Sequence, residues 1–193
     1  MSATLIDGKA VAARIRGQIA EDVAKMEAEH GIRPGLAAVL VGDNPASHSY
    51  VRMKRKACDE VGIASFGYTL PADAPQEEVE KLVAELNADP KVHGILVQLP
   101  LPKHLDEEKI LSMISLHKDV DGFHPVNIGR LAMKGREPLF IPCTPHGAIV
   151  LLEEAGATFE GSNAVVLGRS NIVGLPAALL LIHRNATVTV GHS

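Results

Sequence analysis

The first part of the chain carries apolar residues at helical spacing. These positions are Val11, Ile15, Ile19, Val23 and Met26. Residues three or four apart lie on one face of a helix, so the pattern predicts an amphipathic helix. We place this helix over residues 9–30, where Gly31 ends it.

Beyond this helix, short apolar runs alternate with further helical patterns. Glycine and proline bound most of the runs, which is typical of buried strands. The predicted strands are residues 36–41, 64–70, 93–99, 163–167 and 187–190. The predicted helices are residues 47–61, with Ser47 as the cap, then 76–87, 106–114, 145–154 and 174–183. This alternation predicts an α/β fold with mostly parallel strands and helices on both faces of the sheet.

The periodicity weakens between Asp119 and Pro145, where glycine and proline are frequent. We interpret this stretch as a connection that carries loops and part of a cleft between two lobes. The predicted domains are a first lobe over residues 1–144, an α/β sandwich, and a second over residues 145–193. The second lobe contains one β–α–β unit and is expected to be the start of a Rossmann-like lobe, truncated at its end.

Composition narrows the class of protein. The 193 residues are 46% hydrophobic and only 3% aromatic, with a net charge of −4. The sequence has no basic tract, which argues against nucleic-acid binding. Residues 1–8 do not resemble a signal peptide, and no apolar segment approaches the ~20 residues that span a bilayer. The two cysteines, Cys58 and Cys143, suggest a reducing compartment, so we expect a soluble cytoplasmic protein.

Tyr50 and Lys54 lie four residues apart on the predicted helix 47–61 and therefore share a face. A phenol and an amine on one face can form a proton-transfer pair. The alternative is a surface helix with a solvated lysine, and spacing alone favours that alternative. Cys58 falls on the same face as Lys54, where we expect a small buried residue.

Two polar residues follow predicted strands. Gln98 lies near the carboxyl end of strand 93–99, the end at which open α/β sheets bind ligands. It is expected either to contact a substrate or orient Lys54, or to be satisfied by the backbone. Asp121, beside Asp119, can grip adjacent N–H donors of a heterocycle through paired hydrogen bonds. The alternative is an ordinary Asp-Gly turn, and the histidines form no metal-binding motif.

The segment Gly168–Gly174 follows strand 163–167 and precedes a helix. This is the context of a phosphate-binding loop, where a helix N-terminus offers free N–H groups. The dinucleotide motif G-x-G-x-x-G is not met, because Ser170 replaces the second glycine and the last is displaced. An ordinary turn between strand and helix remains the alternative.

Together these segments resemble one family, the bifunctional methylenetetrahydrofolate dehydrogenases/methenyltetrahydrofolate cyclohydrolases. The matching segments, in the family's order and spacing, are residues 46–54, 94–102, 118–123, 142–145 and 168–174. They span nearly all of the chain. Two positions depart from the pattern: Leu175 stands where many members carry a basic residue, and Gly191 where many carry cysteine.

The resemblance implies a role for each candidate residue. Lys54 would be the general acid/base of the cyclohydrolase step, with Tyr50 beside it and Gln98 tuning it. Asp121 would hold the N–H groups of the pterin, and Ser47 would also contact substrate. The residues implied to contact the dinucleotide are Gly168, Arg169, Ser170 and Ser193, the last near the 2′-phosphate of NADP.

The implied reaction oxidises 5,10-methylenetetrahydrofolate to the methenyl cation with NADP, or with NAD. Water then opens the cation to 10-formyltetrahydrofolate, in the same cleft and without a metal. The setting would be one-carbon metabolism and purine biosynthesis, and the protein a cytoplasmic homodimer.

Two alternatives remain. One is a catalytically incomplete folate-binding fragment. The other is a different oxidoreductase that uses Tyr-x-x-x-Lys with NAD(P). In the short-chain dehydrogenases that pair follows the glycine loop, whereas Tyr50 precedes Gly168 here. The order of motifs therefore argues against the second alternative.

Overall fold

A computed structural model describes residues 5–193 of the chain. Residues 1–4, part of the segment from which we predict no signal peptide, lie outside the described residues. The chain forms two compact units, one of residues 12–120 and one that joins the chain up to Val11 with residues 121–193. The predicted domain boundary after residue 144 remains a prediction.

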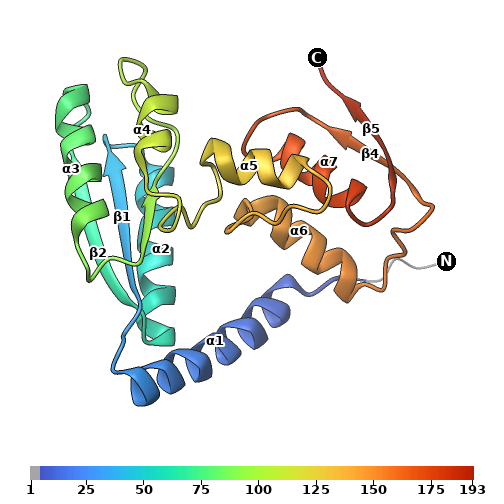
Figure 1. The fold of residues 1–193 in the computed structure, drawn as a ribbon, viewed down its shortest axis with the longest axis horizontal. Helices are drawn as coiled ribbons and strands as arrows, with labels where there is room; N and C mark the ends of the chain where they lie inside the picture. Colours follow the sequence, from blue (N-terminus) through green and yellow to red (C-terminus); the bar gives the residue numbers. More distant parts are fainter. Residues whose placement is uncertain (1–4) are drawn as a thin grey trace. The chain divides into compact units, whose positions relative to one another are not determined.

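The unit of residues 12–120 is built around a parallel sheet. Its elements are α1 (Gly8–His30), which begins in the other unit, β1 (Gly35–Val41), α2 (Pro45–Val61), β2 (Ala64–Leu70), α3 (Gln76–Ala88), β3 (Gly94–Val97) and α4 (Glu107–Met113). The strands lie in the order β2-β1-β3, and both pairs are parallel (Figure 1). The predicted parallel α/β arrangement is confirmed.

The central strand β1 is buried on both faces. Ala37, Val39 and Val41 belong to a core cluster with residues of α3, β3 and α4. Ala38 and Leu40 alternate with them and therefore point to the opposite face. Helix α2 contacts β1 and β2, and it lies across the sheet from α3 (Figure 1). A strand enclosed in this way needs a continuous apolar run, which explains the sequence of β1.

The other unit holds α5 (Pro125–Ala132), α6 (Cys143–Glu154), β4 (Asn163–Leu167), α7 (Gly174–Ile182) and β5 (Thr187–Gly191). Strands β4 and β5 pair in parallel, with α7 as their crossover helix. Leu131, Ile149 and Leu180 form the core between α5, α6 and α7. The predicted β–α–β unit of a Rossmann-like lobe is therefore confirmed.

The connection predicted over residues 119–145 was expected to carry loops, and this is wrong where the helix α5 forms. Pro125 occupies the first turn, where its missing N–H has no helical partner in any case. The His124 ring accepts a hydrogen bond from the backbone N–H of Val126 at 3.1 Å and caps the helix. Leu131, only 1% exposed, anchors it in the core. Glycine and proline here mark a short helix instead of a loop.

Ser47 was also predicted to cap α2, and this is wrong. Asn44 is the cap: its side-chain oxygen accepts from the N–H groups of Ala46 and Ser47 at 2.9 and 3.3 Å. The helix thus begins earlier, at Pro45, and Ser47 lies buried in its first turn.

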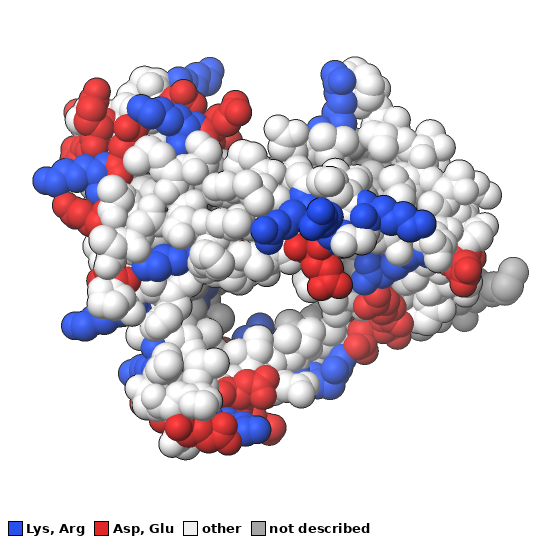
Figure 2. Space-filling model, viewed as in Figure 1, with Lys and Arg blue, Asp and Glu red and all other residues white. Residues whose placement is uncertain are grey.

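The surface mixes charges of both signs. On the face shown in Figure 2, basic and acidic side chains are interspersed over α3 and α1. Within residues 5–193, no helix is both long and apolar enough to cross a membrane.

Candidate functional site

The structure joins Lys54 and Gln98, which lie far apart in the sequence. Gln98 directly follows β3 and continues its ladder, since its backbone N–H donates to the carbonyl of Val39 at 2.8 Å. Its side-chain Nε2 donates to the carbonyl of Leu99 at 2.8 Å. This bond fixes the amide so that Oε1 accepts from Lys54 Nζ at 3.2 Å. The backbone therefore orients Gln98, and Gln98 orients the ammonium of Lys54.

Helix α2 presents the remaining candidates of this region. Tyr50 lies one turn before Lys54 and is 55% exposed, so its phenol is open to a ligand. Lys54 is half-buried, and Ser47 is buried. An amine held by an amide beside an exposed phenol can pass protons to a bound molecule.

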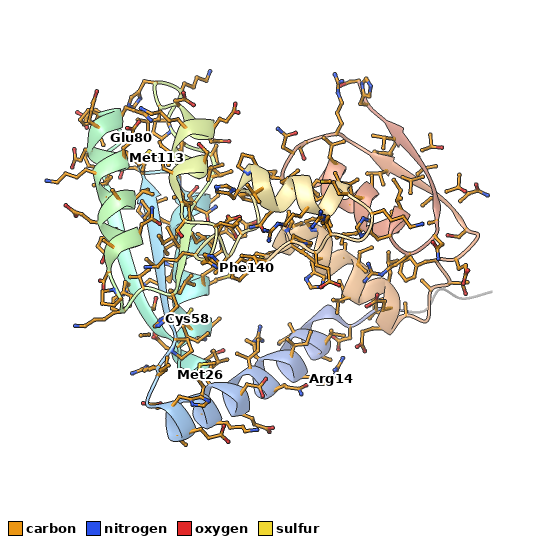
Figure 3. All side chains as sticks on the ribbon, viewed as in Figure 1. Arg14, Met26, Cys58, Glu80, Met113 and Phe140 are labelled. Atoms are coloured by element: carbon orange, nitrogen blue, oxygen red, sulfur yellow. The ribbon has the colours of Figure 1, made fainter. Side chains whose placement is uncertain are left out.

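Cys58, one turn after Lys54, is a buried residue of α2 (Figure 3), as expected. Burial, followed by the nearby Asp59 carboxylate, raises the pKa of its thiol. A thiol with a raised pKa is a poor nucleophile at neutral pH, so Cys58 fills space in the structure.

The two predicted carboxylates occupy different environments. Asp119 is 1% exposed and forms a parallel bridge with Ile95 of β3. Asp121 is half-buried and opens the unit of residues 121–193. Gly122 follows with φ of +68°, where a side chain would also collide with the backbone of Ile141 and Pro142. This turn fixes the chain after Asp121, whose role in holding the pterin remains a prediction.

The glycine loop has a defined turn between β4 and α7. Gly168 has φ of +117°, a conformation that favours glycine. A Cβ on Gly174 would collide with the carbonyl of Gly168, so the helix can begin here only with glycine. Ser170 Oγ accepts from the N–H groups of Val173 and Gly174 at 3.2 and 3.3 Å. Ser170 thus replaces the motif's second glycine with a hydroxyl that accepts from the first N–H of α7 and from the N–H of Val173 before it.

A pocket of about 700 Å³ opens beside this loop. Its lining residues are Leu167, Gly168, Arg169, Gly191, His192 and Ser193. It lies at the carboxyl ends of β4 and β5, where Leu167 and Gly191 are partners in register. Three of the predicted cofactor residues, Gly168, Arg169 and Ser193, line it. A basic guanidinium beside a glycine turn suits a phosphorylated ligand.

Sequence reasoning did not single out His192 and Leu167 as parts of this pocket. The signal was available, because neighbouring parallel strands end at the same edge of a sheet.

Among the described residues, no group of three or more His, Cys, Asp or Glu is placed to hold a metal ion.

Two family models match the chain. Residues 6–121 match the tetrahydrofolate dehydrogenase/cyclohydrolase catalytic domain, and residues 142–193 match the NAD(P)-binding domain of the same family. The first holds the Lys54–Gln98 pair and Asp121. The second holds the glycine loop and its pocket.

Individual relatives agree with this assignment. The bifunctional FolD protein of Moorella thermoacetica is 56% identical over the whole chain, which covers 68% of that protein. A chloroplastic bifunctional FolD protein of Arabidopsis thaliana is 60% identical over 99% of the chain, which spans 53% of its length. The Trypanosoma brucei enzyme FolD, solved with NADP and an inhibitor, superposes with a TM-score of 0.97 at 44% identity. The whole chain matches 65% of that structure. The chain thus spans about half to two thirds of these relatives, and it belongs to the tetrahydrofolate dehydrogenase/cyclohydrolase family.

Proposed function

We propose that the protein oxidises 5,10-methylenetetrahydrofolate to 5,10-methenyltetrahydrofolate with NADP and then hydrolyses the product to 10-formyltetrahydrofolate. The observation that carries the proposal is the match of both the catalytic and the NAD(P)-binding family models to one chain. The Lys54–Gln98 contact and the pocket beside the glycine loop lie within these two matches and supply chemistry suited to each.

In the oxidation, the dinucleotide binds at the pocket beside Gly168. The solved Trypanosoma brucei relative holds NADP, which supports the choice of cofactor. NADP accepts the hydride from the methylene carbon, and the chain binds and orients it. Gly168 lets the backbone approach the pyrophosphate, and Arg169 offers its guanidinium to phosphate oxygens. Ser193, on the pocket wall, is proposed to contact the 2′-phosphate, and Ser170 to hold the loop in shape.

In the hydrolysis, Lys54 transfers the proton. Water adds to the electrophilic methenyl carbon, and its oxygen becomes the formyl oxygen, so the water loses both protons. One of them is released to solvent, and the ring nitrogen that leaves gains the other. Lys54 Nζ, held by Gln98 at 3.2 Å, is proposed to move this proton, with the Tyr50 phenol beside it. Asp121 is proposed to accept hydrogen bonds from the amino and amide N–H groups of the pterin. Ser47, buried in the first turn of α2, is proposed to contact the substrate.

The direct test mixes the protein with methylenetetrahydrofolate and NADP and follows the absorbance of reduced nicotinamide and of the methenyl compound. We expect both dinucleotide reduction and loss of the methenyl intermediate. Binding of folate in calorimetry without reduction of NADP would favour the alternative of a catalytically incomplete folate-binding protein. Repeating the assay with NAD measures cofactor preference.

We also propose that the protein is a homodimer in the cytoplasm and serves purine biosynthesis through its formyl product. Neither Cys58 nor Cys143 forms a disulfide, which suits a reducing compartment. Analytical ultracentrifugation tests the dimer, and a monomer at micromolar concentration contradicts it. Fractionation of the source cells tests the compartment, since one relative is chloroplastic.

A further inference from the structure

The segment that leads to Asp121 is bound along the free edge of β3. We call residues 114–120 the strap, because they connect α4 to the start of the other unit. The backbone N–H of Ile95 donates to the carbonyl of Lys118 at 2.7 Å, and Ile95 forms a parallel bridge with Asp119. Val120 packs where a Cβ on Gly94 would stand. The strap therefore joins the free edge of the sheet through a single parallel bridge, just before Asp121.

Lys118 connects the opposite side of the strap to the end of α3 through hydrogen bonds. Its Nζ donates to the carbonyls of Leu86, Asn87 and Asp89 at 3.0, 2.8 and 2.8 Å. These contacts employ all three N–H donors of an ammonium. The last carbonyls of a helix lack partners within it and carry partial negative charge, which a cation offsets. Helix α3 has no basic residue in its own last turn, so Lys118 supplies that charge.

Asn87 holds the beginning of the strap from the same helix end. Its Nδ2 donates to the carbonyl of Met113 at 2.8 Å, and its Oδ1 accepts from the N–H of Ser115 at 2.8 Å. Met113, labelled in Figure 3, is the last residue of α4. The Lys118 N–H closes the turn by donating to the carbonyl of Ser115 at 2.7 Å. The beginning of the strap and Lys118 are thus both fixed to one helix terminus.

We propose that Lys118 is a positioning residue for the Asp121 carboxylate, acting through the strap. The inference rests on the proposed function, in which Asp121 binds the pterin. With the ammonium in place, the backbone up to Val120 is held by β3 on one side and α3 on the other. Without it, three carbonyls at the end of α3 lose a partner. Asn87 still holds the beginning of the strap, but the stretch next to Asp121 loses its contact with α3. Asp121 then samples more orientations, and binding must pay the cost of ordering it.

Kinetics of Lys118→Met, Lys118→Arg and Lys91→Met test this role. Lys91 is the matched control, because it is an exposed lysine two residues after Asp89 in the same turn. We expect Lys118→Met to raise the KM for methylenetetrahydrofolate about tenfold or more, the scale of losing hydrogen bonds to a charged group. The KM for NADP and the kcat should change little. Lys118→Arg, which retains a cation and donors, should recover part of the loss, and Lys91→Met should match the parent.

Hydrogen exchange without any ligand tests the strap independently of the folate reaction. The amides of Ile95 and Val120 both donate to the carbonyl of Lys118, at 2.7 and 2.9 Å. We expect them to exchange faster in Lys118→Met and at the parental rate in Lys91→Met. Faster exchange with an unchanged folate KM would mean that Lys118 stabilises the strap without affecting folate binding, and would overturn the proposal. Unchanged exchange would also overturn it.

A parent protein that shows no folate turnover would contradict the proposed function instead. In that case calorimetry with tetrahydrofolate on the same variants still decides the role of Lys118. Folate affinity that is equal in the parent and Lys118→Met would overturn it. If Lys118→Met fails to fold, Lys118→Arg carries the test through both its exchange rates and its KM.

Discussion

At the scale of single residues, the orientation of the Gln98 side-chain amide determines how Lys54 is held. Gln98 can face Lys54 with its oxygen or its nitrogen, and only the oxygen accepts from an ammonium. Because Nε2 donates to the Leu99 carbonyl, Oε1 is the atom that faces Lys54. Gln98 therefore acts as an acceptor that holds Nζ in place without adding a charge. A carboxylate in its position would bind the ammonium more tightly and oppose its release of a proton.

This arrangement predicts that Lys54→Met abolishes hydrolysis and leaves some oxidation. The methionine side chain preserves the volume along α2 but has no proton to transfer. We expect the rate of methenyl hydrolysis to fall about a hundredfold or more, as for loss of a general acid or base. The measurement is decay of the methenyl absorbance, with NADP reduction followed in parallel.

Lys56→Met is the matched control on the same helix. Lys56 is exposed and forms an ion pair with Glu60 at 3.8 Å, well within the solvated side of α2. It should hydrolyse the methenyl compound at the parental rate. Equal hydrolysis by Lys54→Met and Lys56→Met would remove Lys54 from the mechanism.

At the scale of elements, the beginning of α7 depends on one hydroxyl. Ser170 Oγ accepts from the N–H of Gly174, the first residue of α7, and from that of Val173 just before it, although Ser170 precedes the helix by four residues. We predict that Ser170→Ala destabilises the protein by about 1 kcal/mol, the usual effect of losing a helix cap. Urea unfolding followed by circular dichroism measures this. Ser193→Ala, an exposed serine, should leave the free energy of unfolding unchanged, and equal effects of both changes would contradict the capping role.

The pairing of α3 with α4 should respond to pH through Glu80, labelled in Figure 3. Its carboxylate accepts from Lys109 Nζ at 2.7 Å and Gln76 Nε2 at 2.6 Å, and these bonds, that of Lys109 first, hold the pKa of Glu80 below its ordinary 4.5. Glu80 in turn raises the pKa of Lys109 above 10.5. A lowered carboxyl pKa stabilises the fold above 4.5, and this contribution disappears as the pH falls through the lowered value.

We therefore predict that Glu80→Gln is less stable than the parent at neutral pH. The difference between their free energies of unfolding should disappear at low and at high pH. It closes in acid as Glu80 is protonated, and in alkali above 10.5 as Lys109 loses its proton. Thermal unfolding across pH measures the difference. Glu85→Gln on the same helix, whose partner Lys81 lies 3.9 Å away in an exposed pair, should show little effect at any pH. A difference that is independent of pH would exclude the ion pair as its source.

At the scale of the whole molecule, local patterns predicted the elements, but not the contacts that fix the site. The strands 64–70 and 163–167 have their predicted bounds, because apolar runs between turn residues are a local signal. Helix α5 was missed, because Pro125 and Gly129 resemble a loop unless the buried Leu131 is known. The hydrogen bonds from Lys118 to α3 join residues some thirty positions apart in the sequence, and no hydrophobic periodicity predicts such contacts.

The candidate residues divide in the same way. Motif resemblance identified Lys54 and Gln98, but spacing alone favoured a solvated lysine, and only the fold shows their bond. Ser47 was assigned as a cap because its residue type suits one, whereas Asn44, three residues earlier, takes that place. Residue type limits what a position can do, and the tertiary fold selects among the possibilities.

The division into two units leads to a last prediction about where a ligand acts. The amide of Gly168 donates to the carbonyl of Gly191 at 2.8 Å, and both residues line the pocket within the unit of residues 121–193. NADP at a hundred times its Kd stabilises the state that binds it by about 2.7 kcal/mol. We expect exchange of the Gly168 amide to slow strongly with NADP, while the amides of β2, an edge strand of the other unit, keep their rates.

Adenosine without phosphates is the control, because it lacks the groups that the glycine loop and Arg169 would hold. Equal slowing in β2 and at Gly168 would show that the dinucleotide acts on the fold as a whole, and slowing confined to β2 would place its site away from the glycine loop.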